Sequence, residues 1–342
     1  MAGVRGVLAV NAGSSSLKVA AFRADSLERI ATGEVDDLGE RDHDAALAEV
    51  LPKLGAHDWI AIGHRVVQGR ERLGPHVVDA KLRAELETLI PLAPLHQPHC
   101  LAGIDAARRL APHALQVACF DTSFHRTLPD VARRYALPAE FAEIEAYGFH
   151  GLSYEYIASV LPDHLGPRAR GRVIVAHLGS GASMCALRDR ISIATTMGFT
   201  PLDGLVMGTR PGALDPGAVL YLIEQRGLTA AQVRDLLYHR AGLLGVSGIS
   251  ASMQTLLASH DRRAAEAIEL FVYRAVTSIG SLAASLGGLD ALVFTGGIGE
   301  HSAAIRDRIT AGARWLGDFV VASIATDEEI VIARHTRALA ER

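Results

Sequence analysis

The sequence predicts an α/β fold made of two related halves, and three observations lead to it. Strand-like apolar runs alternate with helix-like runs along the 342 residues, which is the pattern of α/β proteins. A chain of this length suits two domains, because one domain commonly holds about 100–200 residues. The third observation is an internal repeat: residues 8–22 and 174–187 both read as a strand, a turn of glycine and serine, and a second strand. Two such halves would hold a ligand in the cleft between them.

The expected strands and helices follow from the spacing of apolar residues. Short, continuous apolar runs predict strands at 7–10, 19–22, 59–62, 115–120, 173–177, 184–187 and 291–294. Apolar residues at helical spacing predict helices at 81–90, 99–110, 218–226, 230–239, 263–286 and 302–309. Most of these strands end in glycine or polar residues, and ligands of open α/β sheets collect at that end. The helical spacing of 327–342 predicts a last helix that returns to the first domain.

Composition and charge exclude several classes of protein. The formal net charge is −4 and no dense run of Lys or Arg occurs, which argues against a nucleic-acid partner. Cys100, Cys119 and Cys185 are widely spaced among apolar residues, so we expect reduced, buried thiols in a cytoplasmic protein and no disulfide framework or zinc cluster. The first residues contain no long apolar stretch with a cleavage site, so we expect no secretion signal. Charges and glycines interrupt the apolar stretch 271–297, so we expect no membrane span.

The turn between the first two strands is the most informative motif. It reads Asn11-Ala-Gly-Ser14-Ser-Ser-Leu-Lys18. Glycine lets the backbone approach an anion closely, successive N–H groups form an anion-binding concavity, and Lys18 adds positive charge. The spacing is not that of a Walker A loop. A phosphate-binding hairpin and an ordinary surface turn both fit these residue types.

Four polar segments at strand ends carry residues suited to phosphoryl transfer, and they contain Arg65, Asp121, His150 and Arg210. This reaction depends mainly on positive charge and positioning, and arginine donates in pairs to carboxylate and phosphoryl groups. Each residue also has an ordinary structural alternative: the arginines as ion-pair partners, the histidine as a core residue, the aspartate as a turn cap. A fifth segment, 290–300, is an apolar strand that runs into a diglycine turn, a pattern that can hold a nucleotide.

Together these motifs resemble the acetate kinase family, within the larger sugar kinase, heat-shock ATPase and actin superfamily. The motifs occur in the order expected for that family, at 11–18, 63–67, 93–96, 120–125, 148–151, 177–183, 196–210, 242–250, 294–300 and 326–334. The resemblance implies two ribonuclease H-like domains of the actin-like ATPase type, with the ligand cleft between them. The first would span 1–150, joined by the C-terminal helix 327–342, and carry the acyl and phosphoryl side. The second would span 151–326 and carry the nucleotide side.

The resemblance also implies an activity and a set of site residues. The activity is reversible, Mg²⁺- or Mn²⁺-dependent phosphoryl transfer from ATP to acetate, giving acetyl phosphate and ADP, in a cytoplasmic homodimer that binds neither nucleic acid nor membrane. Catalytic roles fall to Asp121, His150 and Arg210, and metal binding to Asn11 and Glu328. The acyl group would contact Arg65, Val67, Leu95, His96 and Pro201. The nucleotide would contact Lys18, Ser14, His177, Leu178, Gly179, Ser180, Gly181, Ser252, Met253, Gln254, Gly296, Gly297, Ile298, Gly299 and Glu300.

The chain departs from the family mainly on the nucleotide side. Relatives usually carry Asn at the position of Ser180, an Asp-aromatic-Arg or Asp-Met-Arg triplet at 252–254, and Asn at the position of His301. Gln68 and Arg70 also replace a usual His and Gly. Three alternatives therefore stay open: a propionate or butyrate kinase, a different phosphoryl donor such as another nucleotide or pyrophosphate, and a nucleotide-binding regulator without turnover.

Overall fold

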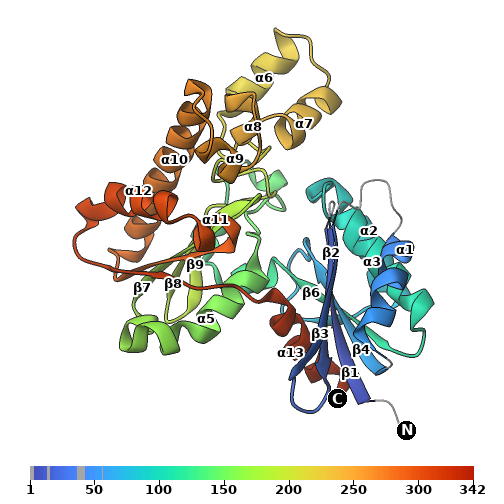
Figure 1. Ribbon diagram of the computed structural model, residues 1–342. Coiled ribbons are helices and arrows are strands. Elements are labelled where there is room, and N and C mark those ends of the chain that lie inside the picture. The colour runs from blue at the N-terminus through green and yellow to red at the C-terminus, as the bar shows by residue number, and fades with distance from the viewer. Residues whose placement is uncertain (1–3, 14–15, 37–42, 56) are drawn as a thin grey trace. The chain divides into compact units, whose positions relative to one another are not determined.

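The computed structural model describes residues 4–13, 16–36, 43–55 and 57–342, which form two compact units (Figure 1). The first unit combines Met1–Arg126, Phe149–Tyr156 and Asp327–Arg342, and the second combines Thr127–Gly148 and Ile157–Thr326. Compared with the predicted boundary between 150 and 151, residues 151–156 lie in the first unit and residues 127–148 lie in the second. The physical reason is bonding at the end of that segment, where the N–H groups of Tyr147 and Gly148 donate to the carbonyl of Gly198.

A six-stranded sheet forms the centre of the first unit, in the order β3-β2-β1-β4-β6-β5. Its strands are β1 (Val4–Ala12), β2 (Ser16–Arg23), β3 (Arg29–Asp36), β4 (His57–Val66), β5 (His76–Val77) and β6 (Leu115–Phe120). β1 pairs antiparallel with β2 and parallel with β4, which pairs parallel with β6. The carboxyl ends of β1, β4 and β6 consequently meet at one edge of the sheet, where Asn11, Arg65 and Asp121 lie.

Helices cover both faces of this sheet (Figure 1). On one face α1 (His43–Val50) and α3 (Gln97–Leu110) share a buried cluster with β1 and β2, and α2 (Ala80–Glu87) lies next to α3. On the other face α13 (Glu328–Ala340) packs through Ile332. A Cβ on Gly63 would lie 2.0 Å from Thr336 Oγ1, so only glycine at this position lets α13 approach β4 so closely. The predicted C-terminal helix thus packs on the first unit.

The second unit contains a five-stranded sheet with the same pairing pattern, in the order β11-β10-β7-β8-β9. Its strands are β7 (Arg172–Leu178), β8 (Ala182–Arg188), β9 (Ile191–Thr195), β10 (Ala291–Thr295) and β11 (Val320–Ser323). β7 pairs antiparallel with β8 and parallel with β10, as β1 pairs with β2 and β4. This confirms the two similar halves predicted from the repeat, with Asn11 facing Lys18 in one hairpin and His177 facing Ser183 in the other.

The helices of the second unit include one long apolar helix, α10 (Arg262–Leu286), which packs against β7, β8 and β9. By length and composition α10 is the one described helix apolar enough to cross a membrane, a test that core helices also pass. Its Phe271, Ile279 and Leu286 are buried, and the chain then turns through Gly287 at φ +73° into β10. The remaining helices are α4 (Asp130–Arg133), α5 (Gly151–Leu165, which begins in the first unit), α6 (Pro216–Glu224), α7 (Ala230–His239), α8 (Gly242–Ser247), α9 (Met253–Leu257), α11 (Gly296–His301) and α12 (Ala303–Ala313).

Candidate active site

A buried ion pair joins the ends of two parallel strands in the first unit. Arg65 lies opposite Cys119 in the β4–β6 register, and Asp121 follows β6 directly. Arg65 Nη2 lies 2.7 Å from Asp121 Oδ2 and Arg65 Nε lies 3.1 Å from Oδ1, a two-point pairing. The Arg65 side chain is 19% exposed and that of Asp121 only 1%. Burial opposes the charge on Arg65, but the carboxylates of Asp121 and Glu328 outweigh it and raise the pKa of Arg65 above its ordinary value.

Asn11 and Glu328 complete this cluster from β1 and from the first residue of α13. Asn11 Nδ2 donates to Glu328 Oε2 at 3.2 Å, and Arg65 Nη1 donates to Asn11 Oδ1 at 3.3 Å. Burial raises the pKa of Glu328 to about 7; the guanidinium of Arg65 works against this shift and the carboxylate of Asp121 adds to it. One guanidinium therefore faces two carboxylates, that of Asp121 buried and that of Glu328 partly buried, so an added positive charge there would favour the ionised form of Glu328.

The turn that carries His150 is attached to the backbone of Asp121. The N–H of Gly151 donates to the Asp121 carbonyl at 2.9 Å, and a Cβ at Gly151 would lie 2.1 Å from that oxygen. His150 itself has φ +57°, a conformation that places it on a sharp bend before α5. Burial lowers the pKa of His125 to about 4, so its ring is neutral. His125 Nε2 lies 2.9 Å from the Phe149 carbonyl, and this contact holds the residue before His150. His150 and Asp121 thus share one rigid backbone corner.

The predicted acyl-contacting residues of the first unit lie on two loops that are bonded to each other. Val67 is buried directly after β4, and Leu95 and His96 directly precede α3. Gln97 Oε1 accepts from the N–H of Gln68 at 3.1 Å, and Gln97 Nε2 donates to the Gln68 carbonyl at 3.2 Å. The pair fixes the loop after β4 against the loop before α3. Both bonds use the backbone of Gln68, so they do not depend on the side chain at position 68.

Arg210 and Pro201 lie together in the second unit. Arg210 is 7% exposed, and its Nη1 donates to the Pro201 carbonyl at 2.6 Å. The N–H of Gly208 donates to the Ser180 carbonyl at 3.0 Å, which ties this loop to the β7–β8 hairpin. The loop between 196 and 210 therefore joins the predicted phosphoryl-binding arginine to the predicted nucleotide turn.

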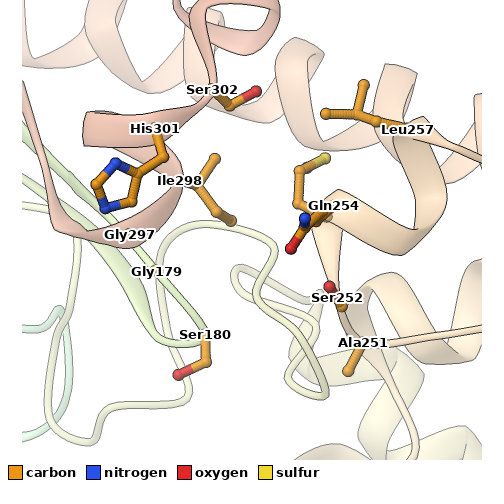
Figure 2. A pocket seen from close by; sticks show the side chains of 11 residues that line it. Gly179, Ser180, Ala251, Ser252, Gln254, Leu257, Gly297, Ile298, His301 and Ser302 are labelled. Carbon is orange, nitrogen blue, oxygen red and sulfur yellow. The ribbon is translucent and has the colours of Figure 1, made fainter.

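A cavity of about 780 Å³ opens beside that hairpin in the second unit (Figure 2). It is lined by Gly179, Ser180, Ala251, Ser252, Met253, Gln254, Leu257, Gly297, Ile298, His301 and Ser302. The side chains of Gln254 and Leu257 come from α9, and those of Ile298 and His301 come from α11 (Figure 2). None of these residues is Asp, Glu, Lys or Arg. The volume and the mixed apolar and polar lining are typical of a small-molecule site.

Glycines make room for a ligand at the bottom of this cavity. A Cβ at Gly297 would meet no atom within 4 Å, so its backbone is open to the cavity. A Cβ at Gly179 would lie 3.9 Å from Gly297 N, so the hairpin turn lies beside the start of α11. Gly296 has φ +76°, and its N–H donates to Glu300 Oε1 at 2.9 Å. Glu300 also accepts from the N–H of Thr326 at 3.2 Å, so this carboxylate supports the turn from outside the cavity.

The sequence predicted seven of the residues that line the cavity: Gly179, Ser180, Ser252, Met253, Gln254, Gly297 and Ile298. His177, Leu178, Gly181, Gly296, Gly299 and Glu300 lie in the adjoining strand ends and turns but do not line it. Ala251, Leu257, His301 and Ser302 were not among the predicted contacts. Leu257 could have been predicted, because it follows Met253 by four residues and so lies on the same face of a helix.

Two predicted nucleotide-contacting residues, Ser14 and Lys18, belong to the first hairpin and not to the lining of the cavity. Ser14 lies outside the described residues. Lys18 lies on β2 with its side chain 52% exposed, and its Nζ is 3.0 Å from Glu34 Oε1 on β3. Its proposed contact with nucleotide phosphate would therefore compete with this exposed ion pair.

Two curated relatives of this chain are named as acetate kinases. The sequence model of the acetokinase family matches residues 32–335. An acetate kinase of Rhodopseudomonas palustris (strain TIE-1) is 49% identical, with 98% of each chain covered. An acetate kinase of Methylocella silvestris is 45% identical, covering 99% of this chain and 98% of the relative.

Solved structures agree with these relatives. The crystal structure of Porphyromonas gingivalis acetate kinase has a TM-score of 0.86 and 32% identity, covering 98% of this chain and 99% of that one. A propionate kinase from Francisella tularensis has a TM-score of 0.89 and 33% identity, covering 99% of this chain and 100% of that one. The agreement extends over the whole fold, both sheets included. The chain therefore belongs to the acetokinase family.

Proposed function

We propose that this member of the acetokinase family is an acetate kinase, which transfers a phosphoryl group reversibly between ATP and acetate, with acetyl phosphate and ADP as products. The observation that carries the proposal is the buried cluster of Arg65, Asp121, Asn11 and Glu328 at the end of the first sheet. A purely nucleotide-binding regulator has no chemical need for it. The names of the full-length relatives agree with this activity.

The mechanism we propose is direct, in-line attack of an acetate oxygen on the γ-phosphoryl group. Arg65 and Arg210 are assigned to the acyl carboxylate and the transferring phosphoryl group, and His150 to the charge that develops in the transition state. Acetate is already ionised at neutral pH, so no strong base is needed. The two-point pairing of Asp121 with Arg65 supports a positioning role for this carboxylate.

Mg²⁺ or Mn²⁺ fits the oxygen donors of the first unit. Asn11 Oδ1 and the Glu328 carboxylate would hold the ion, and the raised pKa of Glu328 marks a carboxylate that lacks full compensation. Such a hard ion commonly keeps waters and substrate phosphates as its other ligands. This suits a site where the described residues contain no group of three His, Cys, Asp or Glu side chains able to hold a metal. When bound, the ion would neutralise phosphate charge.

The cavity of the second unit supports a nucleotide as the phosphoryl donor. Its volume of about 780 Å³ leaves room for a base and ribose, which pyrophosphate would not fill. We assign to this site the predicted nucleotide residues that line it, together with His177, Leu178, Gly181, Gly296, Gly299 and Glu300 of the adjoining strand ends and turns. Lys18 and Ser14 of the first hairpin remain assigned to the nucleotide as well. Ser252 and Gln254 line the cavity, and with the backbone of the glycine turns they would supply its polar contacts to the nucleotide. The site would bind nucleotide with fewer charge-assisted hydrogen bonds than the family pattern implies.

Val67, Leu95 and Pro201 are assigned to the wall that limits the acyl chain, and His96 is assigned to the same substrate site. One methylene in such a pocket is worth about 1–3 kcal/mol. Propionate is therefore the second candidate substrate, and the similar Francisella tularensis structure, a propionate kinase, favours it specifically.

We further propose that the protein is a cytoplasmic homodimer. All three cysteines are free and buried, which agrees with a reducing compartment. Helix α6 has no buried residue and exposes Leu220, Tyr221 and Ile223. Such an apolar face is typical of a protein interface, and light scattering of the purified protein measures whether a dimer forms.

The test of the proposed function is acyl phosphate formation by purified protein. ATP, GTP and pyrophosphate are each combined with acetate, propionate and butyrate, in the presence of Mg²⁺. We expect the highest kcat/KM with acetate and a nucleoside triphosphate. Turnover with pyrophosphate alone would contradict the assignment of the cavity, and no turnover with any pair would favour the regulator.

A further inference from the structure

We propose that Tyr135 positions the acyl-site loop 196–210 and thereby sets the acyl chain length that the enzyme accepts. The inference rests on the proposed roles of Pro201 and Arg210. It concerns a residue outside the predicted site, in the segment 127–148, and all contacts that carry it lie within the second unit.

The hydroxyl of Tyr135 forms a hydrogen bond at the centre of the contact. The N–H of Phe199 donates to Tyr135 Oη at 2.9 Å. Burial, together with the nearby carboxylate of Asp203, raises the pKa of Tyr135, although the Phe199 bond acts in the opposite direction. The hydroxyl is therefore neutral at physiological pH and accepts the bond from Phe199, while the residue as a whole is 39% exposed.

A second contact holds the same loop from the other end of the segment. The N–H groups of Tyr147 and Gly148 donate to the Gly198 carbonyl at 3.0 Å and 3.3 Å. The rings of Tyr147 and Phe199 lie 5.9 Å apart between centroids. Both backbone groups of the Gly198–Phe199 peptide are thus bonded to one segment, the carbonyl near its end and the N–H through Tyr135.

The segment is built to hold Tyr135 still. Arg134 and Glu145 form an isolated antiparallel bridge. The N–H of Ala146 donates to the Arg133 carbonyl at 2.8 Å, and Arg133 Nη1 lies 3.3 Å from Glu145 Oε2. These bonds close the base of the loop that starts next to Tyr135, so its hydroxyl is anchored to a closed frame and not to a free chain end.

The absence of a side chain at position 198 is required for this contact. A Cβ on Gly198 would lie 2.1 Å from Tyr135 Oη and 2.7 Å from Asp203 Oδ2. The backbone of Gly198 does not adopt a positive φ. Space, not conformation, therefore explains glycine at this position.

The Gly198–Phe199 peptide is close in sequence to Pro201, a residue of the proposed acyl site. Pro201 follows Phe199 by two residues, and its carbonyl accepts from Arg210 Nη1 at 2.6 Å. No strand or α-helix covers 196–210, so the place of Pro201 depends on such individual bonds. A shift of the peptide at 198 and 199 would move the proline ring, which limits the acyl chain, and the arginine bonded to it.

Tyr135→Phe tests the inference, because it removes the acceptor and keeps the ring. We expect KM for acetate to rise about 2- to 10-fold, as for the loss of one hydrogen bond, with kcat changed less. The ratio of kcat/KM for acetate to that for butyrate should change by at least about threefold. Tyr273→Phe, on an exposed tyrosine of α10, is the matched control. An unaltered acyl ratio in Tyr135→Phe, whatever its Tm, would overturn the inference.

Gly198→Ala is a second test, and it remains informative if the variants lose stability, because the same change is compared in two backgrounds. Alone, this change should impair acetate turnover and alter the acyl ratio, because its Cβ meets the hydroxyl. Combined with Tyr135→Phe it should be tolerated better, since the nearest ring atom is then 3.4 Å away and only Asp203 must move. Equal impairment in both backgrounds would contradict the proposed contact.

Pro201→Ala separates this inference from the proposed function. An altered acyl ratio in Pro201→Ala with an unaltered one in Tyr135→Phe would leave the acyl site in place and overturn the role of Tyr135. An unaltered ratio in Pro201→Ala would remove Pro201 from the acyl wall, and with it the basis of the inference.

Discussion

Glu328→Gln should make the protein more stable at pH 8 while it abolishes turnover. The buried carboxylate has a pKa raised from 4.5 to about 7, chiefly by burial. Because the folded protein holds this proton more tightly than the unfolded chain, its stability falls as pH rises from 4.5 to about 7. That difference corresponds to about 3 kcal/mol. Glutamine has nearly the same shape and cannot ionise, so it removes this loss.

The assay is the free energy of unfolding in urea, measured without metal at pH 5 and pH 8. At pH 8 the variant should exceed the wild type by up to about 3 kcal/mol, and at pH 5 by less than about 1 kcal/mol. All other titrating groups are common to both proteins, so the difference reports on Glu328. Glu329→Gln, the next residue of α13, is the control and should leave the pH dependence nearly unchanged.

The result also bears on metal binding. Mg²⁺ should stabilise the wild type at pH 8 more than it stabilises Glu328→Gln, because the ion compensates an ionised carboxylate. A variant that is less stable than the wild type at pH 8, or that keeps the same pH dependence, would refute this reasoning. It would mean that Arg65 already compensates Glu328 in full.

Three further predictions concern other parts of the molecule. Gly297→Ala should leave Tm unchanged and raise KM for ATP about tenfold, because the added Cβ meets no protein atom and enters the cavity. Gly296→Ala should lower the free energy of unfolding by about 1–3 kcal/mol, because the residue has φ +76°. Kinetics and calorimetry on both variants check these two outcomes. Gln254→Arg should lower KM for ATP about 2- to 10-fold by adding a hydrogen bond, and an unchanged KM would show that this side chain is remote from the nucleotide. Burial opposes a charge on His335, but Cys119 and Glu155 outweigh it and raise its pKa to about 10. The stabilisation by this imidazolium is therefore complete below pH 6.5 and is lost as pH rises through about 10. In urea unfolding, His335→Gln should be less stable than the wild type by about 1 kcal/mol at pH 6 and equally stable above pH 10.

Continuous apolar runs made several elements predictable from the sequence. β1, β6, β7 and β10 are buried strands, and residues of these runs have almost no alternative to a core position. Helix α10 was predictable in the same way. The strands and helices that sequence reasoning missed carry mixed patterns: β3 lies at a sheet edge and mixes the charged Arg29, Glu34 and Asp36 with apolar and small residues. Helix α5 contains Pro162, which argues against a helix on local grounds.

The candidate site was predictable only in part, because its members are far apart in the chain. Asn11 and Glu328 are separated by 317 positions and yet lie within hydrogen-bond distance. No local pattern relates them, and the resemblance to a family supplied the pair. Gln68 and Arg70 are both departures from the family, and in the structure Gln68 Oε1 accepts from the N–H of Arg70 at 2.8 Å. A comparison of residue types position by position does not reveal that these two departures are in contact.

The cluster around Arg65 is the centre of the proposed mechanism, and one comparison of variants tests it most directly. Arg83 offers a matched control in the same unit, since it makes the same two-point pairing with Asp105, with Nη2 to Oδ2 at 2.8 Å. The measurement is kcat/KM for acetyl phosphate formation in Arg65→Ala and Arg83→Ala. We expect a loss of at least about 100-fold in Arg65→Ala, as for removal of a charge that stabilises the transition state. Arg83→Ala should stay within a few-fold of the wild type. Near-normal kinetics in Arg65→Ala, or equal losses in both variants, would contradict the assignment of Arg65 to the reacting groups.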